Sequence, residues 1–257
     1  MILCGRLFTF FQCDWFKKVV WKRCFIFFGI VCFGIFLGNG KVECSDSRVV
    51  SCKNFPDRTV LLTFDDGPSS ATKEVLDALK NENASAIFFI VGEKANEKEG
   101  KKILKLIADS GHMIANHGYK HVTMTKLTEK EQISSLDKTN SCIKEFQKTV
   151  LYFRPPGGAC NNILKRSVNS LGMKIMFWNV DPRDWKKNDC GARPSRSALK
   201  ERILKGLEDQ GHKGIVLLHD IHLNTALAVP MILDALKKNG YSFMKPEDVL
   251  KYQKASK

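Results

Sequence analysis

The sequence predicts an α/β fold, a closed or partly closed (β/α) barrel of about seven parallel strands. From residue 59 onward, short apolar runs alternate with amphipathic helical stretches, which is the pattern of a parallel sheet covered on both faces. Polar motifs follow successive apolar runs, where a β/α barrel places its functional side chains. No glycine-rich dinucleotide loop follows the first strand, which argues against an open doubly wound sheet.

The first 40 residues differ in character from the rest. Residues 24–37 are fourteen residues without a charge, and four basic residues precede them: Lys17, Lys18, Lys22 and Arg23. A membrane span needs about 20 apolar residues, so a shorter run is typical of a signal-peptide core. We expect residues 1–40 to be a cytoplasmic basic segment followed by a signal peptide or a signal anchor. The basic flank stays inside, so the rest of the chain is expected to be exported to the periplasm, cell surface or extracellular space.

Residues 41–57 form a polar lead-in, and residues 58–257 form the expected functional domain. The net charge of the chain is +14, and removing the first 40 residues, with five basic and one acidic group, leaves about +10. The basic residues are spread over amphipathic helical faces, as in 101–107, and nothing resembles a nucleic-acid-binding module. We therefore expect no nucleic-acid partner, and contact with a membrane only through the N-terminal segment.

Five of the nine cysteines lie beyond residue 40. No two of them have the close spacing of a zinc knuckle, so scattered buried or bridged cysteines are favoured. Cys44 and Cys52 are the pair best placed for a local disulfide.

The apolar runs and helical patterns give the elements in order. Residues 60–64 and 86–91 are expected strands around a helix at 71–81, in which Val75, Leu76 and Leu79 recur at helical spacing. Further strands are expected at 113–115, 151–153, 174–180, 214–218 and 241–244. The helices between them are expected near 98–110, 128–147, 161–170, 196–209 and 225–238.

Asp65 and Asp66 leave the first strand together in the motif TFDDGP. Adjacent side chains at a strand end point in different directions, so one carboxylate can bind a metal while the other faces an attacking water. The same four residues, Asp-Asp-Gly-Pro, taken alone also fit a surface turn.

His117 and His121 are four residues apart in the motif HGYKH, which on one helical turn puts both imidazoles on the same side. With one carboxylate they make a three-ligand site with positions left for water and substrate, as in catalytic zinc sites. Two histidines and a carboxylate could equally hold iron for oxygen chemistry. His112 and His212 are expected to be surface or core residues.

Three further motifs supply polar groups at strand ends. His219 in LLHD emerges from a buried strand and could protonate a departing amine, the alternative being a core histidine bonded to Asp220. Arg154 in RPPGG and Asp184 in DPRDW are expected to pair, and the guanidinium would keep Asp65 ionised.

Gly157 and Trp185 belong to the same two motifs. The backbone can approach a substrate closely at Gly157, so its N–H could face a developing oxyanion. Trp185 offers an apolar face to a sugar ring.

The five motifs, in this order, resemble those of the polysaccharide deacetylases, carbohydrate esterase family four, also called the NodB homology domain. The resemblance covers residues 59–252 and implies a distorted β/α barrel that removes acetyl groups from sugars, usually N-acetylglucosamine in chitin or peptidoglycan. It implies a divalent metal, zinc before others, and an N-acetylated polysaccharide or oligosaccharide substrate.

The resemblance also implies a role for each motif residue. Asp65 resembles the catalytic base and His219 the catalytic acid, and Arg154 and Asp184 match the pair that tunes the base. The residues that resemble the metal ligands are Asp66, His117 and His121. Those that match substrate-binding positions are Gly157, Trp185 and Leu217, the last two as walls of the acetate pocket.

Two glycines depart from the commonest family pattern. Gly118 stands where a serine or threonine often braces the histidine loop, and Gly157 stands where an aromatic residue is common. The expected reaction is hydrolysis of an acetamide to acetate and a free amino sugar. A catalytically silent glycan-binding homologue and an iron oxygenase are the alternatives, and the complete acid–base set argues against both.

Overall fold

The computed structural model describes residues 49–253. The expected export segment, residues 1–40, lies outside this range, and so does Cys44. No helix within 49–253 is long and apolar enough to cross a membrane. Cys52 is a free cysteine within the described range, and the disulfide expected between Cys44 and Cys52 involves a residue outside it.

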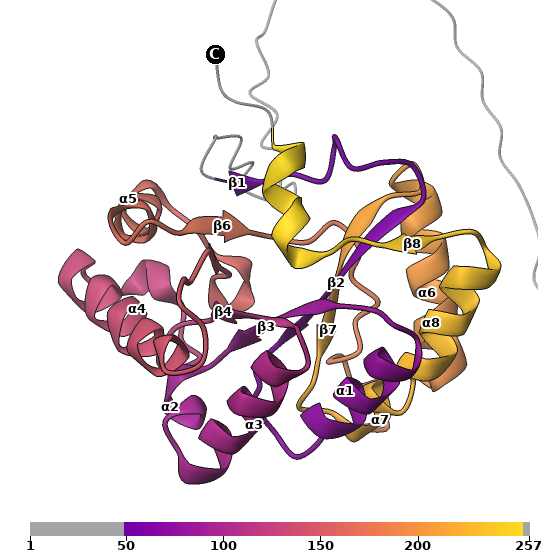
Figure 1. Cartoon of the computed structure of the whole chain (residues 1–257), viewed down its shortest axis with the longest axis horizontal. Coiled ribbons are helices and arrows are strands. Elements are labelled where there is room, and N and C mark those ends of the chain that lie inside the picture. The colour runs from indigo at the N-terminus through magenta and orange to yellow at the C-terminus, as the bar shows by residue number, and fades with distance from the viewer. Residues whose placement is uncertain (1–48, 254–257) are drawn as a thin grey trace, which may run out of the picture. The chain divides into compact units, whose positions relative to one another are not determined.

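One curved, parallel sheet forms the centre of the fold, with the strand order β1-β6-β5-β4-β3-β2-β7 and β8 paired to β2 (Figure 1). Seven strands were expected, and the short β1 in the lead-in is an addition. The expected α/β class and barrel-like sheet are confirmed. The strands are β1 Val49–Val50, β2 Thr59–Asp65, β3 Ala86–Ile90, β4 Met113–Asn116, β5 Tyr152–Phe153, β6 Lys174–Met176, β7 Gly214–His219 and β8 Ser242–Phe243.

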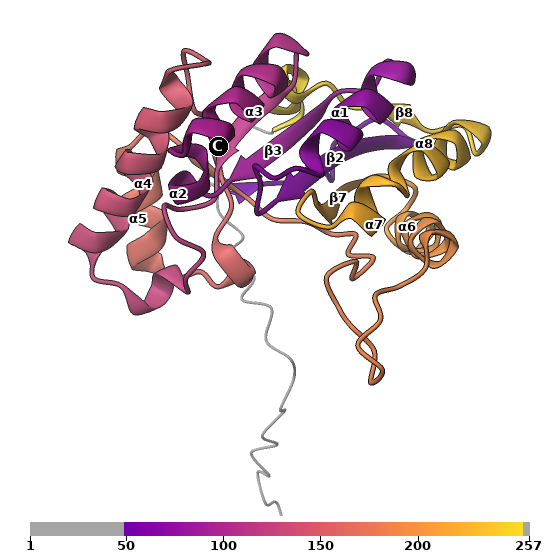
Figure 2. The ribbon, with the colours of Figure 1, turned by 90° about the horizontal axis from the view of Figure 1, so that it is seen from below.

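Helices cover the outer face of the curved sheet (Figure 2). The helix expected at 225–238 is two helices, because Pro230, which has no N–H to donate, stands in the first turn of a new one. The α-helices are α1 Thr72–Asn81, α2 Gly92–Ala95, α3 Lys98–Asp109, α4 Glu129–Lys144, α5 Asn162–Ser170, α6 Arg196–Asp209, α7 Leu223–Ala226 and α8 Val229–Lys238. The short 3-10 helices are η1 Met124–Lys126, η2 Pro156–Gly158 and η3 Pro246–Tyr252.

The alternation of side chains along β2 divides the core into two layers. Val60, Leu62 and Phe64 belong to the cluster between the sheet and the helices. Leu61 belongs to a second cluster with residues such as Ile87 and Tyr152, on the inner face of the curved sheet. Because successive side chains of a strand point to opposite faces, Asp65 lies on the inner face as well.

The sheet is partly closed by the segment that follows β6. We expected a strand from 174 to 180, but β6 ends at Met176 because the chain then crosses to β7. There Val180 forms a parallel bridge with Val216, and the Leu217 N–H donates to the Val180 carbonyl at 2.9 Å. This crossing brings the next segment, which includes Asp184, over the end of β7.

Candidate active site

The predicted polar residues meet at the carboxyl ends of the parallel strands. Asp65 is the last residue of β2 and is paired in register with His219, the last residue of β7. His117 directly follows β4, and Arg154 directly follows β5. Parallel strands end at the same edge of a sheet, so these four side chains, distant in sequence, come together.

Asp66, His117 and His121 form a cluster whose ligand atoms all lie within 4.8 Å of one another. Asp66 Oδ1 lies 3.2 Å from His117 Nε2 and 3.3 Å from His121 Nε2. This oxygen is buried and has no hydrogen-bond partner within the described residues. One carboxylate and two imidazoles aimed at a common point are a donor set that fits a divalent metal such as zinc.

The histidine motif is a loop, so the expected helical turn is wrong. Gly118 has a φ of 80°, a conformation that interrupts a helix and favours glycine. The loop is nonetheless braced, because the Tyr119 N–H donates to the Ser135 hydroxyl at 2.9 Å and the Gly118 N–H donates to Asn116 Oδ1 at 2.8 Å. The brace that the sequence lacks at Gly118 is thus supplied from α4 and β4.

The orientation of His117 is fixed by its second ring nitrogen. His117 Nδ1 lies 2.7 Å from the Arg154 carbonyl, which can only accept a hydrogen bond. Nδ1 therefore donates this hydrogen bond, and Nε2 is the ring nitrogen that faces Asp66. His117 is buried, whereas 51% of the His121 side chain is exposed, so the cluster opens to solvent on the side of His121.

Asp65 is held by a fully buried arginine. Arg154 Nη1 donates to Asp65 Oδ1 at 2.7 Å and to the Thr63 hydroxyl at 2.8 Å. Arg154 Nε and Nη2 donate to the carbonyls of Met176, the last residue of β6, at 3.0 Å and of Phe177, where the chain begins to cross to β7, at 3.1 Å. Burial lowers the pKa of Arg154, and the charge of Asp65 opposes this. The guanidinium of Arg154 thus links the start of the crossing segment to the carboxylate of Asp65.

The expected Arg154–Asp184 pair is wrong, because Asp184 bonds to His219 instead. Asp184 Oδ1 lies 2.8 Å from His219 Nδ1, and Oδ2 accepts from the His219 N–H at 2.8 Å and the Thr225 hydroxyl at 2.9 Å. Asp184 is fully buried. Burial by itself would lower the pKa of His219, but the bond to Asp184 and the charges of Asp65 and Asp66 raise it to about 9. His219 is therefore cationic at neutral pH in the metal-free chain.

Asp220, next to His219, has a structural role that the sequence did not suggest. Its Oδ2 accepts from the Thr72 hydroxyl at 2.5 Å, and its carbonyl accepts from the Ser69 hydroxyl at 2.6 Å. A Cβ on Gly67 would come within 2.4 Å of this carboxyl group. Burial raises the pKa of Asp220 to about 7. Asp220 thus packs under the turn that carries Asp66, and the alternative of a His219–Asp220 bond is excluded.

The three residues matched to substrate-binding positions have different surroundings. Leu217 is buried in β7, and Gly157 lies in η2 with a φ of 66° and no heavy atom within 4 Å of a Cβ built there. Trp185 is 47% exposed, and it adjoins Asp184 in the segment between β6 and α6. His222, at the start of α7, was not part of any motif, and its ring centre lies 6.1 Å from that of His219.

The fold and the site correspond to one known class of proteins. The family model for polysaccharide deacetylases matches residues 53–176. The peptidoglycan-N-acetylglucosamine deacetylase PgdA of Listeria monocytogenes is 35% identical over 191 residues, covering 73% of this chain and 38% of the relative. The peptidoglycan-N-acetylmuramic acid deacetylase PdaA of Bacillus subtilis is 31% identical over 201 residues, covering 77% of this chain and 73% of the relative. The chain therefore spans little more than a third of the Listeria protein but most of the Bacillus protein.

Solved structures agree with this relationship. A structure from Bacillus anthracis, described as a CE4 family pseudoenzyme, has a TM-score of 0.68 and 27% identity, covering 77% of this chain and 67% of that one. The curved sheet and the five motifs thus define a carbohydrate-esterase type of domain. The chain belongs to the polysaccharide deacetylase family.

Proposed function

We propose that the protein is a metal-dependent hydrolase that removes acetyl groups from the N-acetylated sugars of peptidoglycan and releases acetate. The observation that carries the proposal is the convergence of two buried charged couples on one ligand cluster. Asp65 is paired with Arg154, and His219 with Asp184. A base and an acid on opposite sides of a bound acetamide are what amide hydrolysis needs.

In this proposal the cluster of Asp66, His117 and His121 holds a divalent ion, zinc before others. The ion, when bound, supplies a Lewis acid for the acetamide carbonyl and a water of lowered pKa. Asp65 takes the proton from the attacking water, and Arg154 keeps that carboxylate ionised and fixed. The Gly157 N–H donates to the developing oxyanion.

The departing nitrogen receives its proton from His219 Nε2. Asp184 holds Nδ1, so the ring keeps one orientation while Nε2 gives its proton to the amine. Leu217 and Trp185 form walls around the acetyl group and the sugar. Acetate and a free amino sugar are the products.

Peptidoglycan is proposed as the substrate because relatives with this domain are named for it. The Listeria protein is named for N-acetylglucosamine and the Bacillus protein for N-acetylmuramic acid, so either sugar is compatible with the domain. A wall substrate also agrees with the expected export through residues 1–40 and with either a cleaved signal or an N-terminal anchor.

The test is acetate release from purified peptidoglycan and from chitin oligosaccharides, with metal analysis of the same sample. We expect release that stops on chelation and returns with added zinc. Asp65→Asn is the matched control, since it should retain metal without releasing acetate. Absence of acetate from every N-acetylated glycan with metal bound would reject the proposed activity.

A catalytically silent glycan-binding protein is the second candidate. The likeness to the Bacillus anthracis structure, described as a pseudoenzyme, favours it. Such a protein would bind glycan, with or without metal, and release no acetate, so the same assay separates the two candidates.

A further inference from the structure

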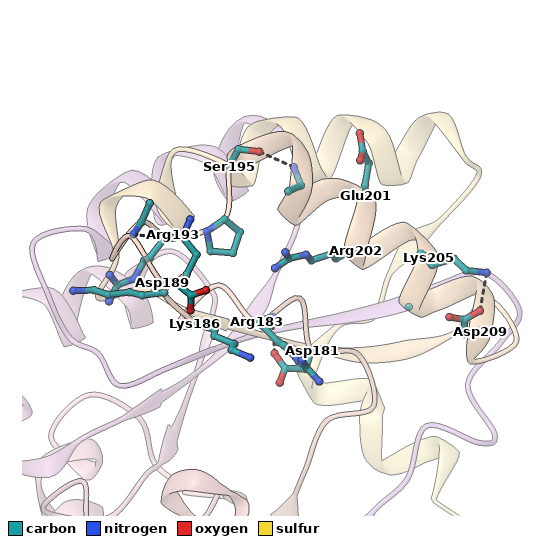
Figure 3. A pocket seen from close by; sticks show the side chains of 16 residues that line it. Asp181, Arg183, Lys186, Asp189, Arg193, Ser195, Glu201, Arg202, Lys205 and Asp209 are labelled. Carbon is teal, nitrogen blue, oxygen red and sulfur yellow. Dashed lines mark hydrogen bonds and ion pairs between the residues drawn. The ribbon is translucent and has the colours of Figure 1, made fainter. Parts of the chain in front are cut away.

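Residues 181–195, which precede α6, form a loop that we call the 181–195 loop. A groove of about 1010 Å³ lies between this loop and one side of α6 (Figure 3). The same space is surrounded by Arg202 from α6 and by Arg183 and Lys186 from the loop (Figure 3). Six basic and four acidic side chains line the groove, so its lining carries a positive excess. The basic side chains are Arg183, Lys186, Lys187, Arg193, Arg202 and Lys205.

Most of these cations lack an ion-pair partner within the described residues, although four carboxylates line the same groove. Lys205 is paired with Asp209 at 2.9 Å, and Arg202 donates to the Pro182 carbonyl at 3.0 Å. The other four cations have no ion-pair partner within residues 49–253. Arg193 Nε is in addition buried without a hydrogen-bond acceptor. Buried donors are almost always satisfied in proteins, so an unmatched one beside free cations indicates a place for an anionic acceptor.

The groove adjoins the proposed catalytic residues. Asp184, near the start of the 181–195 loop, bonds to His219, and at the other end the Asn224 amide donates to the Pro194 carbonyl at 2.8 Å. Beyond the effect of burial, the charge of Arg193 lowers the pKa of His222, whose ring neighbours that of His219. A polymer bound at His219 can therefore extend into the groove.

The backbone at Arg183 supports a role for its side chain. Arg183 has a φ of 56°, and the Asp181 carboxylate holds this conformation by accepting from the Arg183 N–H at 2.8 Å. The left-handed region is unfavourable for a residue with a Cβ and would suit glycine. The loop thus holds Arg183 in an unfavourable backbone conformation that places its guanidinium beside the groove.

We propose that this groove is a subsite for a carboxylate-bearing part of the glycan, next to the sugar that is deacetylated. The inference rests on the proposed function and deepens it. A peptidoglycan strand carries peptide carboxylates, and lactyl carboxylates where the peptide is absent, whereas chitin is neutral. Arginine binds a carboxylate through two parallel N–H donors, and lysine contributes a compact point charge. The groove therefore selects anionic glycans over neutral ones of the same sugar sequence.

The test compares a muramic-acid-containing oligosaccharide with the same molecule after methyl esterification of its carboxylates. The zinc-loaded protein is assayed for acetate release on both. We expect a KM lower by roughly three- to ten-fold for the carboxylate form, from two or three exposed ion pairs. Lys186→Gln/Lys187→Gln should abolish most of this difference and leave kcat unchanged. The control Lys73→Gln/Lys130→Gln, which removes the same charge on α1 and α4, should keep the difference.

Equal KM values for the two forms, or equal loss of preference in both double variants, would overturn the subsite. If neither form releases acetate, the proposed function fails, and the groove is then judged by calorimetric titration with the deacetylated oligosaccharide. Tighter binding of its carboxylate form than of its ester, lost in Lys186→Gln/Lys187→Gln, supports the subsite in that case. Equal binding rejects it.

Discussion

The buried acid–base residues and the exposed lysines of the 181–195 loop differ in how their charges are compensated. Arg154 and Asp184 are fully buried, and each of their charges has a partner within hydrogen-bonding distance. Lys186 and Lys187 are exposed and have no ion-pair partner within the described chain. Paired, desolvated charges hold a fixed geometry, whereas solvated cations attract a partner that arrives from outside. We infer that the first region fixes the reaction and the second selects the substrate.

The largest expected effects separate the two adjacent aspartates. Asp66→Asn removes the anionic ligand, so bound metal should be lost and excess metal should restore part of the activity. Asp65→Asn should keep its metal and lose about 10²- to 10⁴-fold in rate, the usual worth of general-base assistance. Metal content and acetate release are measured on both. Equal metal loss in the two variants would make Asp65 a ligand and require another base.

The next effect concerns the buried arginine. Arg154→Met leaves Asp65 charged and unpaired in the interior, which typically costs about 3–5 kcal/mol of unfolding free energy. Arg166→Met is the matched control, because Arg166 is 56% exposed and lies 3.7 Å from Glu129. It should cost less than about 1 kcal/mol. Urea unfolding measures both, and similar losses would contradict the contrast between buried and exposed charge.

The pH dependence of stability should depend on Asp184. The pKa of His219 in the folded, metal-free chain is raised from 6.5 to about 9, against the effect of burial, first by Asp184. A raised pKa stabilises the fold fully below pH 6.5, and this contribution disappears as the pH rises through about 9. Asp184→Asn should remove most of that dependence. Denaturant titrations of the metal-free protein from pH 6 to 10 test this, and an unchanged slope would contradict it.

The smallest expected effect is on the stability of the loop variants. Lys186→Gln/Lys187→Gln removes two solvated charges, so the unfolding free energy should change by no more than about 0.5 kcal/mol. The same urea titration checks this at pH 7. A larger loss would mean that these lysines belong to the structural charges, and the comparison between the two regions would fail.

Local patterns in the sequence were sufficient for most elements. The expected helix at 196–209 coincides with α6, and the expected strand at 60–64 differs from β2 by one residue at each end. The five motifs also placed Asp65 and His219 at strand ends. These features depend on hydrophobic periodicity and on the rule that functional groups follow parallel strands, and both can be read from nearby residues.

Pairing partners could not be predicted in the same way. Arg154 could be matched with Asp184 by charge alone, but its true partner depends on the crossing after β6, which places Asp184 over His219. The loop form of the histidine motif depends on Asn116 and on Ser135, which is remote in sequence. Asp220 resembles any surface acid until Gly67 and Thr72 are seen against it. Such choices are made by tertiary contacts between distant segments.

The two fixed ends of the 181–195 loop have a consequence for how proteins of this kind can diversify. Asp184 is hydrogen-bonded to His219, and Pro194 to Asn224. Between them, the hydrogen bonds of residues 186–192 are to other residues of the same loop. Insertions, deletions and charge reversals within residues 186–193 should therefore leave His219 in place. An exchange of these residues between relatives, with Asp184 and Trp185 kept, should transfer the glycan preference and leave the catalytic residues unaltered.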